Sequence, residues 1–232
     1  MFWQDDENPQ EFQVSDDVID LVFNIQCREL AVDHAHALGE ALKNAAPTLA
    51  EDDRCAVHSI HLAGSQNGWE RPDPKLGQKL IPSRRTKLII RVPQDLRTQV
   101  EQALDGLTLD IEGDSLTIGK AKTKKLTKQG TIFARHVVLQ PGEESDENQF
   151  LMRIAKEMSA RGIRIKKALC GITQEVQTPD GPLQTRSIMF ADLSLEDAVS
   201  LQQQGIGDHG LIGCGIFIPH KGIDAVKKAQ DD

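Results

Sequence analysis

The sequence predicts an α+β fold of two tandem ferredoxin-like (RRM-like) βαββαβ domains, with a glycine-rich loop near the C-terminus. Three observations predict it. Strand and helix patterns alternate in the order β-α-β-β-α-β, the same order then recurs, and 232 residues suffice for two small domains. The expected divisions are an acidic N-terminal tail (1–17), a first domain (18–119), a basic linker (120–131) and a second domain (132–232).

The first copy of the pattern starts with residues 18–27, where apolar and polar side chains alternate. A period of two predicts a half-buried strand. The next helix is expected to take Asp33 as its N-cap and to end before Pro47, because apolar residues recur every three or four positions between them. The remaining elements are expected as strands at 55–62 and 84–92, a helix that begins at Pro93 and ends at Gly106, and a strand at 107–111 that continues as a hairpin through 115–118.

The second copy follows the same order. A turn sequence, Pro179-Asp180-Gly181, separates two β-branched segments and predicts a hairpin. The expected elements are a strand at 132–139, a helix at 146–161, hairpin strands at 168–176 and 183–191, a helix at 194–204 and a last strand at 214–218.

Basic side chains are clustered although the net charge is −8. Residues 1–20 hold seven acidic and no basic side chains, and the rest of the chain holds 27 basic and 28 acidic ones. Residues 120–128 contain five lysines and no acid. Because local fields decide where a polyanion docks, this cluster is expected to bind nucleic acid, and a solvated loop is the alternative.

Five of the eleven residues from 205 to 215 are glycines. The first six residues match G-x-G-x-x-G, but this segment follows a helix and opens a strand, the reverse of a dinucleotide site, so no nucleotide cofactor is expected. Gly205 suits a helix C-cap. The other glycines indicate a backbone that something approaches closely, and we expect that to be a phosphate backbone. The glycine-rich loop and the basic linker are expected to converge on one cleft.

The four cysteines are far apart and form no C-x-x-C pair, which indicates free thiols in a reducing cytoplasm and argues against a zinc knuckle. No apolar run is long enough for a membrane span, and the acidic N-terminus is unlike a signal peptide. We therefore expect a cytoplasmic protein that does not bind membranes.

Five segments resemble the CRISPR repeat-processing endoribonucleases of the RAMP superfamily, and most closely their myxobacterial-type branch. They are Val32 to Leu38, Leu62 to Gly68, Arg84 to Pro93, Leu116 to Gly119, and Leu201 to Pro219 with its Gly-Cys-Gly-Ile-Phe-Ile-Pro. The resemblance implies an enzyme without metal or cofactor that binds a repeat in the precursor RNA, often as a stem-loop. In that reaction the ribose 2′-OH attacks the adjacent phosphate, giving a 2′,3′-cyclic phosphate and a 5′-OH. Many such enzymes then hold the 3′ handle and join other subunits of a CRISPR effector complex.

The catalytic histidine of this family commonly lies where the first helix begins, and His34 and His36 are there. At 100° per residue the two side chains point about 200° apart, so one site takes only one of them. His34 lies beside the apolar stripe, toward the sheet, and is the expected catalytic residue, with His36 as the second candidate. One alternative is that His34 only packs or forms hydrogen bonds. The other is a metal site with Asp33, but residues at i and i+2 of a helix do not converge on a metal.

The candidates for RNA binding are basic residues, a long loop with one tryptophan, and the glycine-rich loop. They are Arg84, Arg85 and Lys87; Lys120, Lys122, Lys124, Lys125 and Lys128; Trp69 and Arg71; and Gly205, Gly207, His209, Gly210 and Gly213. The chain has no tyrosine and lacks the aromatic signature of RRM sheets, so backbone and shape contacts are expected rather than base stacking. Two other functions stay open: a non-catalytic RNA-binding subunit of a CRISPR effector complex, and a ferredoxin-like protein with a small-molecule or protein partner.

Overall fold

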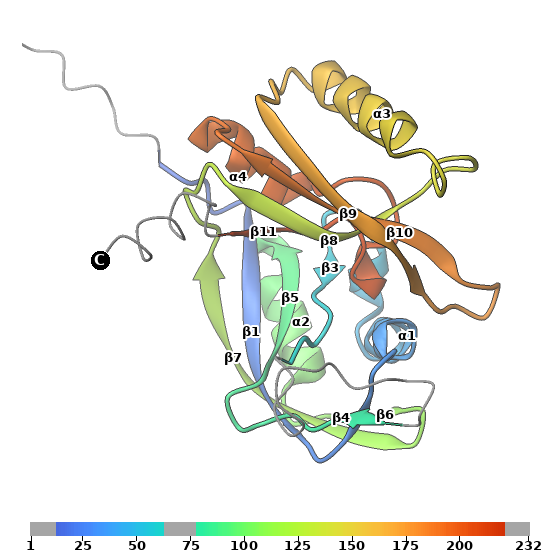
Figure 1. Ribbon diagram of the computed structural model, residues 1–232. Coiled ribbons are helices and arrows are strands. Elements are labelled where there is room, and N and C mark those ends of the chain that lie inside the picture. The colour runs from blue at the N-terminus through green and yellow to red at the C-terminus, as the bar shows by residue number, and fades with distance from the viewer. Residues whose placement is uncertain (1–12, 63–77, 221–232) are drawn as a thin grey trace, which may run out of the picture.

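The computed structural model describes residues 13–62 and 78–220, which form two antiparallel sheets with helices packed on one face of each (Figure 1). The first sheet has the strand order β3-β5-β1-β7-β6. Its strands are β1 (Val18–Cys27), β3 (Ala56–Val57), β5 (Lys87–Pro93), β6 (Thr108–Ile111) and β7 (Asp114–Lys125). Helices α1 (Ala35–Ala45) and α2 (Arg97–Leu104) cover its inner face, and β2 (Leu30–Ala31) pairs with β4 (Lys79–Leu80).

The second sheet has the strand order β11-β8-β10-β9. Its strands are β8 (Ile132–Val138), β9 (Lys167–Val176), β10 (Leu183–Ala191) and β11 (Phe217–Pro219), and its helices are α3 (Glu147–Ala160) and α4 (Leu195–Gln204). In both sheets the first strand of the copy lies between the third and the fourth. This arrangement confirms the predicted pair of ferredoxin-like folds.

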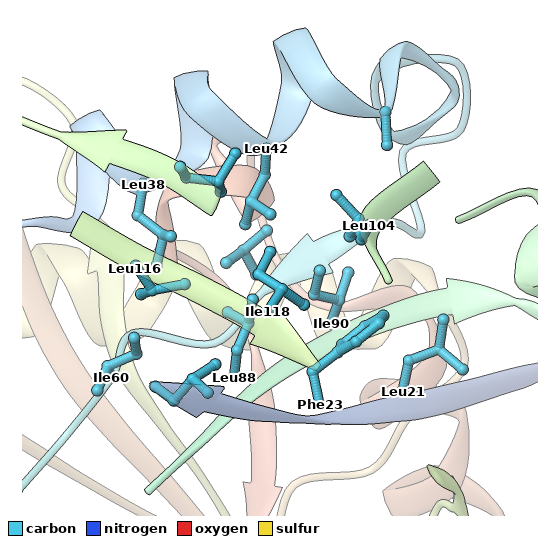
Figure 2. Close-up of a cluster of buried hydrophobic side chains, with 14 of the residues drawn as sticks. Leu21, Phe23, Leu38, Leu42, Ile60, Leu88, Ile90, Leu104, Leu116 and Ile118 are labelled. Carbon is cyan, nitrogen blue, oxygen red and sulfur yellow. The ribbon is translucent and has the colours of Figure 1, made fainter. Parts of the chain in front are cut away.

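Each domain has its own core. In the first, side chains of β1 such as Leu21 and Phe23 point toward Leu38 and Leu42 of α1 (Figure 2). In the second, Phe150 of α3 packs with the inner residues of β8, β10 and β11. The alternation of β1 and the helical spacing of α1 therefore bury the faces that the sequence predicts. No helix among the described residues is both long and apolar enough to cross a membrane.

Helix starts differ from the sequence expectations in the first domain and agree in the second. Asp146 and Ser194 cap α3 and α4 through hydrogen bonds from backbone N–H groups. The predicted cap of α1 is wrong, because His34 occupies the N-cap position and Asp33 accepts a hydrogen bond of 3.2 Å from the backbone N–H of Gln177 in the second domain. The carboxylate that the local sequence predicts as a helix cap therefore binds the other domain instead.

Several strand boundaries also differ. Residues 120–125 are not a linker but continue β7, because β1 is ten residues long and pairs with β7 as far as Ile19↔Lys125. The second strand shrinks to Ala56–Val57, and the last strand starts at Phe217 because the residues before it form a folded turn. Pro93 ends β5, and a 3₁₀ turn separates it from α2.

Candidate functional site

A cavity of about 280 Å³ lies between the two domains and gathers three histidines. His34 comes from the start of α1, His61 from the chain after β3, and His136 from β8, with Arg135 beside it. Backbone and side chains of both domains complete the lining: Val32, Asp33, Ala35, Ser59, Ile60, Gln174, Glu175 and Val176. Imidazole rings and a guanidinium are suited to proton transfer and to charge stabilisation at a phosphate.

His34 is only 3% exposed, and both of its ring nitrogens contact the backbone. Nε2 accepts a hydrogen bond of 3.1 Å from the N–H of Ile60, which places the proton on Nδ1, and Nδ1 donates to the carbonyl of Ala31 at 2.8 Å. The ring therefore ties the start of α1 to the segment that carries His61. This geometry is the one expected of a hydrogen-bonded packing residue, and a direct catalytic role of His34 stays a prediction.

His36 does not line this cavity. It lines a larger one, of about 640 Å³, together with Glu40, Lys43 and the segment 204–210. His34, the N-cap of α1, and His36 in its first turn thus face different cavities, as their spacing in the sequence predicts.

His61 and His136, which were not among the predicted site residues, lie in the cavity with His34. His136 is half-buried, and its Nδ1 lies 3.1 Å from Oγ1 of Thr185. Arg135 and His136 are neighbours in β8, yet both line the cavity, because the pairing of β8 with β10 shifts there: Val137 pairs with Arg186 and Ala134 with Ile188. Such a bulge sets two residues opposite one and re-aims a side chain. Strand alternation alone would have placed the two side chains on opposite faces.

The segment 205–215 connects α4 to β11 and packs on α1 and β3. A Cβ atom added at Gly210 would lie 3.0 Å from the carbonyl oxygen of Cys55, one at Gly213 would collide with Oγ of Ser59, and one at Gly215 would collide with the carbonyl oxygen of Ile206. The close approach that these glycines allow is therefore made by the protein's own atoms. At Gly207 no atom lies within 4 Å of such a Cβ, and the neighbouring His209 is exposed in the left-handed conformation. The tip at 207–209 is the part of the segment open to a ligand.

Three of the predicted RNA-binding lysines share the outer face of the first sheet. On one side of β1, Lys87 of β5 pairs with Asn24. On the other side, Lys122 and Lys124 of β7 pair with Val22 and Asp20. Lys122 and Lys124 are exposed, and Lys87 donates a hydrogen bond of 2.6 Å to Oδ1 of Asn24. We call Lys87, Lys122 and Lys124 the basic face. Lys87 lies on β5, next to β3 in the sheet, whereas Lys122 and Lys124 lie on β7, two strands farther away, so the convergence of all these lysines with the glycine segment stays a prediction.

The other predicted residues lie apart from the basic face. Lys125 forms an ion pair of 2.8 Å with Asp16, and Lys120 lines a depression beside α2 together with Glu101, Gln102 and Asp105. Lys128 is half-buried between β7 and β8, and Arg84 and Arg85 are exposed ahead of β5. Trp69 and Arg71 lie outside the described residues.

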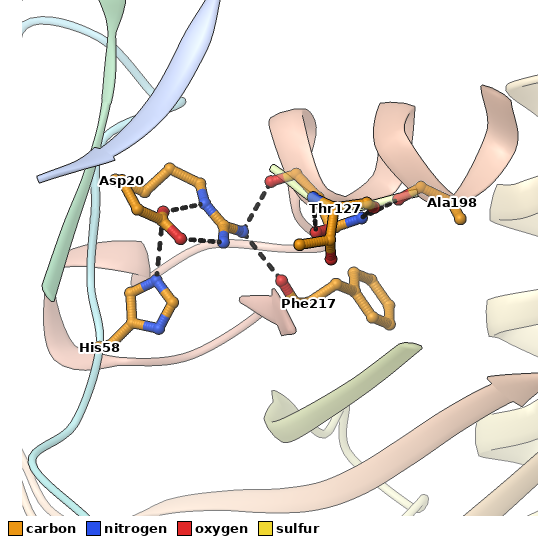
Figure 3. A network of polar contacts seen from close by, with 7 residues as sticks. Asp20, His58, Thr127, Ala198 and Phe217 are labelled. Carbon is orange, nitrogen blue, oxygen red and sulfur yellow. Dashed lines mark hydrogen bonds and ion pairs between the residues drawn. The ribbon is translucent and has the colours of Figure 1, made fainter. Parts of the chain in front are cut away.

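A buried polar network joins the two domains (Figure 3). Arg91 of β5, 2% exposed, faces Asp20 of β1 and donates to its carboxylate at 2.8 and 3.2 Å. The same guanidinium donates to the carbonyls of Gln202 at 2.7 Å and Phe217 at 2.9 Å in the second domain. Arg91 shares the face of Lys87, but α4 and β11 cover it, so it is not available to RNA.

His58 completes this network, with Nε2 at 3.6 Å from the Asp20 carboxylate. Burial alone would raise the pKa of Asp20, but contact with His58 and the positive charge of Arg91 outweigh burial and hold that pKa well below its usual range. Burial lowers the pKa of His58, and the charges of Arg91 and Lys124 add to the effect against the opposing pull of Asp20. The network is therefore an ionised Asp20–Arg91 pair beside a neutral imidazole. Among the described residues, no group of three His, Cys, Asp or Glu side chains is placed to hold a metal ion.

Comparison with known proteins supports the resemblance. Residues 19–222 match the family model described as Cas6 Crispr. The CRISPR-associated endonuclease Cas6 of Myxococcus xanthus (strain DK1622) is 26% identical over 201 residues, which cover 87% of this chain and 81% of that protein. The predicted similarity to the myxobacterial branch is thereby confirmed.

Solved structures show the same fold at low identity. A CRISPR-associated protein Cas6 superposes with a TM-score of 0.60 at 11% identity, covering 88% of this chain and 100% of that one. A Cas6-related protein from Pyrococcus furiosus gives a TM-score of 0.59 at 13% identity, covering 86% and 97%. A RAMP protein described as binding different RNA substrates gives 0.56 at 12% identity, covering 88% and 100%.

Proposed function

Because the chain belongs to the Cas6 family of CRISPR proteins, we propose that it is an endoribonuclease that binds CRISPR repeat RNA and cleaves the precursor transcript. The observation that carries the proposal is the cavity in which His34, His61, His136 and Arg135 meet at the domain interface. The relative from Myxococcus xanthus is named as an endonuclease, and a RAMP protein of the same fold is described as binding RNA.

The proposed chemistry needs no metal. The attacking ribose 2′-OH is already tethered to its phosphate, so the protein has to align the two groups, move protons and stabilise the negative charge of the phosphorane. The products are a 2′,3′-cyclic phosphate and a 5′-OH. One histidine, in its neutral form, accepts the proton of the 2′-OH, and a second histidine, in its protonated form, donates a proton to the leaving 5′ oxygen. The Arg135 guanidinium offsets the negative charge of the phosphate.

The three imidazoles differ in their exposure and in their hydrogen bonds. His34 is the residue that the family resemblance favours, but its Nε2 already accepts the Ile60 N–H. His61 is exposed and His136 is half-buried, so both are more accessible to a substrate than His34, which is 3% exposed. In this proposal His34 acts either directly or by holding the segment 59–61 in place.

RNA would reach the cavity along the basic face. Lys122 and Lys124 project from β7, and Lys124 is the register partner of Asp20, which pairs with the interdomain residue Arg91. Contacts of this kind bind the phosphate backbone and make affinity depend on salt. After cleavage the protein is proposed to keep the 3′ handle of the product and to meet other effector subunits.

A non-catalytic RNA-holding subunit is the second candidate function. The observation that favours it is the engagement of both ring nitrogens of His34 by backbone atoms. It predicts the same tight, salt-sensitive RNA binding without cleavage.

The test incubates the protein with repeat RNA from its own host in EDTA. The matched RNA carries a single 2′-deoxy nucleotide at the cut site. Cleavage of the first RNA alone, with a cyclic phosphate on the product, supports the proposed mechanism. Binding without cleavage of either RNA supports the holding subunit instead.

Four alanine variants then assign the histidines, and His36→Ala is the matched control because it faces the other cavity. We expect cleavage to fall by about 10² to 10⁴ for a histidine that transfers a proton. His36→Ala is expected to keep the wild-type rate. Equal losses for His36→Ala and for His34→Ala, His61→Ala or His136→Ala would remove the cavity from the proposal.

A further inference from the structure

Phe133 is set apart from the other phenylalanines of the described chain by its exposure. Four of the five phenylalanines in the described ranges are completely buried, namely Phe23, Phe150, Phe190 and Phe217. The fifth, Phe133 of β8, is partly exposed. The sequence contains no tyrosine, and both tryptophans lie outside those ranges. An aromatic ring on the surface of this part of the protein is therefore an exception that calls for a physical reason.

Strand register places Phe133 on the open face of the second sheet. Its neighbours Ile132 and Ala134 are buried in the core beneath α3 and α4, so the intervening side chain points the other way. Figure 1 shows both helices along one side of this sheet. On the opposite side, Phe133 forms a row across the sheet with its register partners Ile218, Met189 and Leu169. Leu169, at the far end of the row, is 52% exposed.

Two polar groups with flat π systems flank the ring. The guanidinium carbon of Arg135 lies 5.6 Å from the ring centroid of Phe133, and the imidazole of His220 lies 5.7 Å away at an interplanar angle of 47°. Arg135 also lines the interdomain cavity. The aromatic ring and the candidate catalytic cavity are therefore connected through one side chain.

We propose that Phe133, flanked by Arg135 and His220, stacks on one unpaired nucleobase of the bound RNA next to the cleaved phosphate. The proposal rests on the proposed function and deepens it by naming a nucleotide subsite. Nucleobases stack on aromatic rings presented by the central strands of RRM-like sheets, and β8 is the central strand that corresponds to the first strand of that fold. Arg135 supplies the positive charge that a nucleotide phosphate complements.

The occupant is an unpaired nucleotide rather than a base pair of a stem. Both faces of a base inside a stem are covered by its neighbours, whereas a base beside the stem has a free face. Stacking recognises this free face in any base, since every base has a π surface. The subsite is therefore expected to need a base at one position and to tolerate its identity. The sequence led us to expect backbone and shape contacts more than base stacking on the sheet, because the chain has no tyrosine and lacks the aromatic signature of RRM sheets.

The test uses a repeat RNA that cannot be cleaved, with a 2′-deoxy nucleotide at the cut site. 2-Aminopurine replaces each unpaired nucleotide beside the cut, one at a time, because stacking quenches its fluorescence. We expect quenching at one position with the wild-type protein and with Phe133→Trp. With Phe133→Leu, which keeps an apolar side chain, we expect the quenching to disappear and the Kd to rise by about 5- to 100-fold. An abasic nucleotide at that position is expected to weaken binding to wild type as much, and to weaken Phe133→Leu no further.

Met152→Ala is the matched control, because Met152 is 64% exposed on α3, on the other side of the sheet. Thermal unfolding of each variant checks that the fold is retained. Unchanged Kd and quenching in Phe133→Leu would overturn the proposal while leaving RNA binding intact. RNA binding by wild type without quenching at any position would also overturn it and leave a protein partner as the occupant of this face. Absence of RNA binding by wild type would overturn the proposed function first, and the stacking site with it.

Discussion

The guanidinium of Arg91 in the first domain donates a hydrogen bond of 2.9 Å to the carbonyl of Phe217 in the second. The same guanidinium forms an ion pair with Asp20, so one buried cation binds both β1 in the first domain and β11 in the second. Because the interdomain cavity takes residues from both domains, the orientation that this contact sets also sets the distances within the cavity.

Removing Arg91 is expected to destabilise the protein strongly. Arg91→Met leaves the Asp20 carboxylate buried without its partner, which costs about 3 to 5 kcal/mol of unfolding free energy. Urea unfolding measures the loss. The double variant Asp20→Asn with Arg91→Met is the control, and it is expected to regain part of the stability because no buried charge remains. A single variant as stable as wild type would show that the ion pair does not hold the domains together.

Acidification is expected to weaken the fold through His58. The pKa of His58 is lowered from 6.5 in the folded state, so below about pH 6.5 the unfolded chain binds a proton that the folded chain does not, and stability falls with pH. The lowered pKa of Asp20 has an effect in the same direction: below its ordinary pKa of 3.8 the unfolded chain binds a proton that the folded chain does not, so stability falls further with pH. The measurement compares urea unfolding at pH 7.5 and 5.5. His58→Gln should lose less stability than wild type between these two values, and an equal loss would contradict this account.

Gly213 is expected to be required for folding rather than for binding RNA. Gly213→Ala places a methyl group against Oγ of Ser59 at a φ of 86°, whereas Gly207→Ala meets no atom at a φ of 66°. The second change should cost about 1 kcal/mol of unfolding free energy for its left-handed backbone, and the first about 1 to 3 kcal/mol more. Adding Ser59→Ala to Gly213→Ala should recover part of the difference in thermal unfolding. A Gly213→Ala variant that folds normally but has lost RNA affinity would support a phosphate contact instead.

The basic face makes a prediction about salt. Lys122→Gln with Lys124→Gln removes two exposed charges of β7, so RNA affinity should fall and the slope of log K against log salt should flatten by about 0.7 to 0.9 for each lost phosphate contact. Lys120→Gln is the matched control, because this lysine of the same strand lies beside Glu101 and Asp105 of α2. Filter binding at several salt concentrations gives both slopes. Equal effects of Lys120→Gln and the double change would mean that only the total charge matters.

Local signals in the sequence determined most of the secondary structure and the fold. The alternation of 18–27, the helical stripe after His34 and the helix starts near 146 and 194 depend on residues a few positions apart, and the structure reproduces these elements. The repetition of this order was enough to predict two ferredoxin-like domains.

The site was decided by contacts between distant residues. Residues 120–125 were predicted as part of a linker because nothing local shows that β1 needs a partner of the same length. The sheet face alone also does not show that α4 and β11 cover Arg91. A bulge in β8 turns Arg135 and His136 to one side, and the packing of β3 and α1 brings His61 and His34 to meet them. Sequence periodicity specifies which face of one element is buried, whereas the placement of side chains from separate elements depends on how those elements pack together.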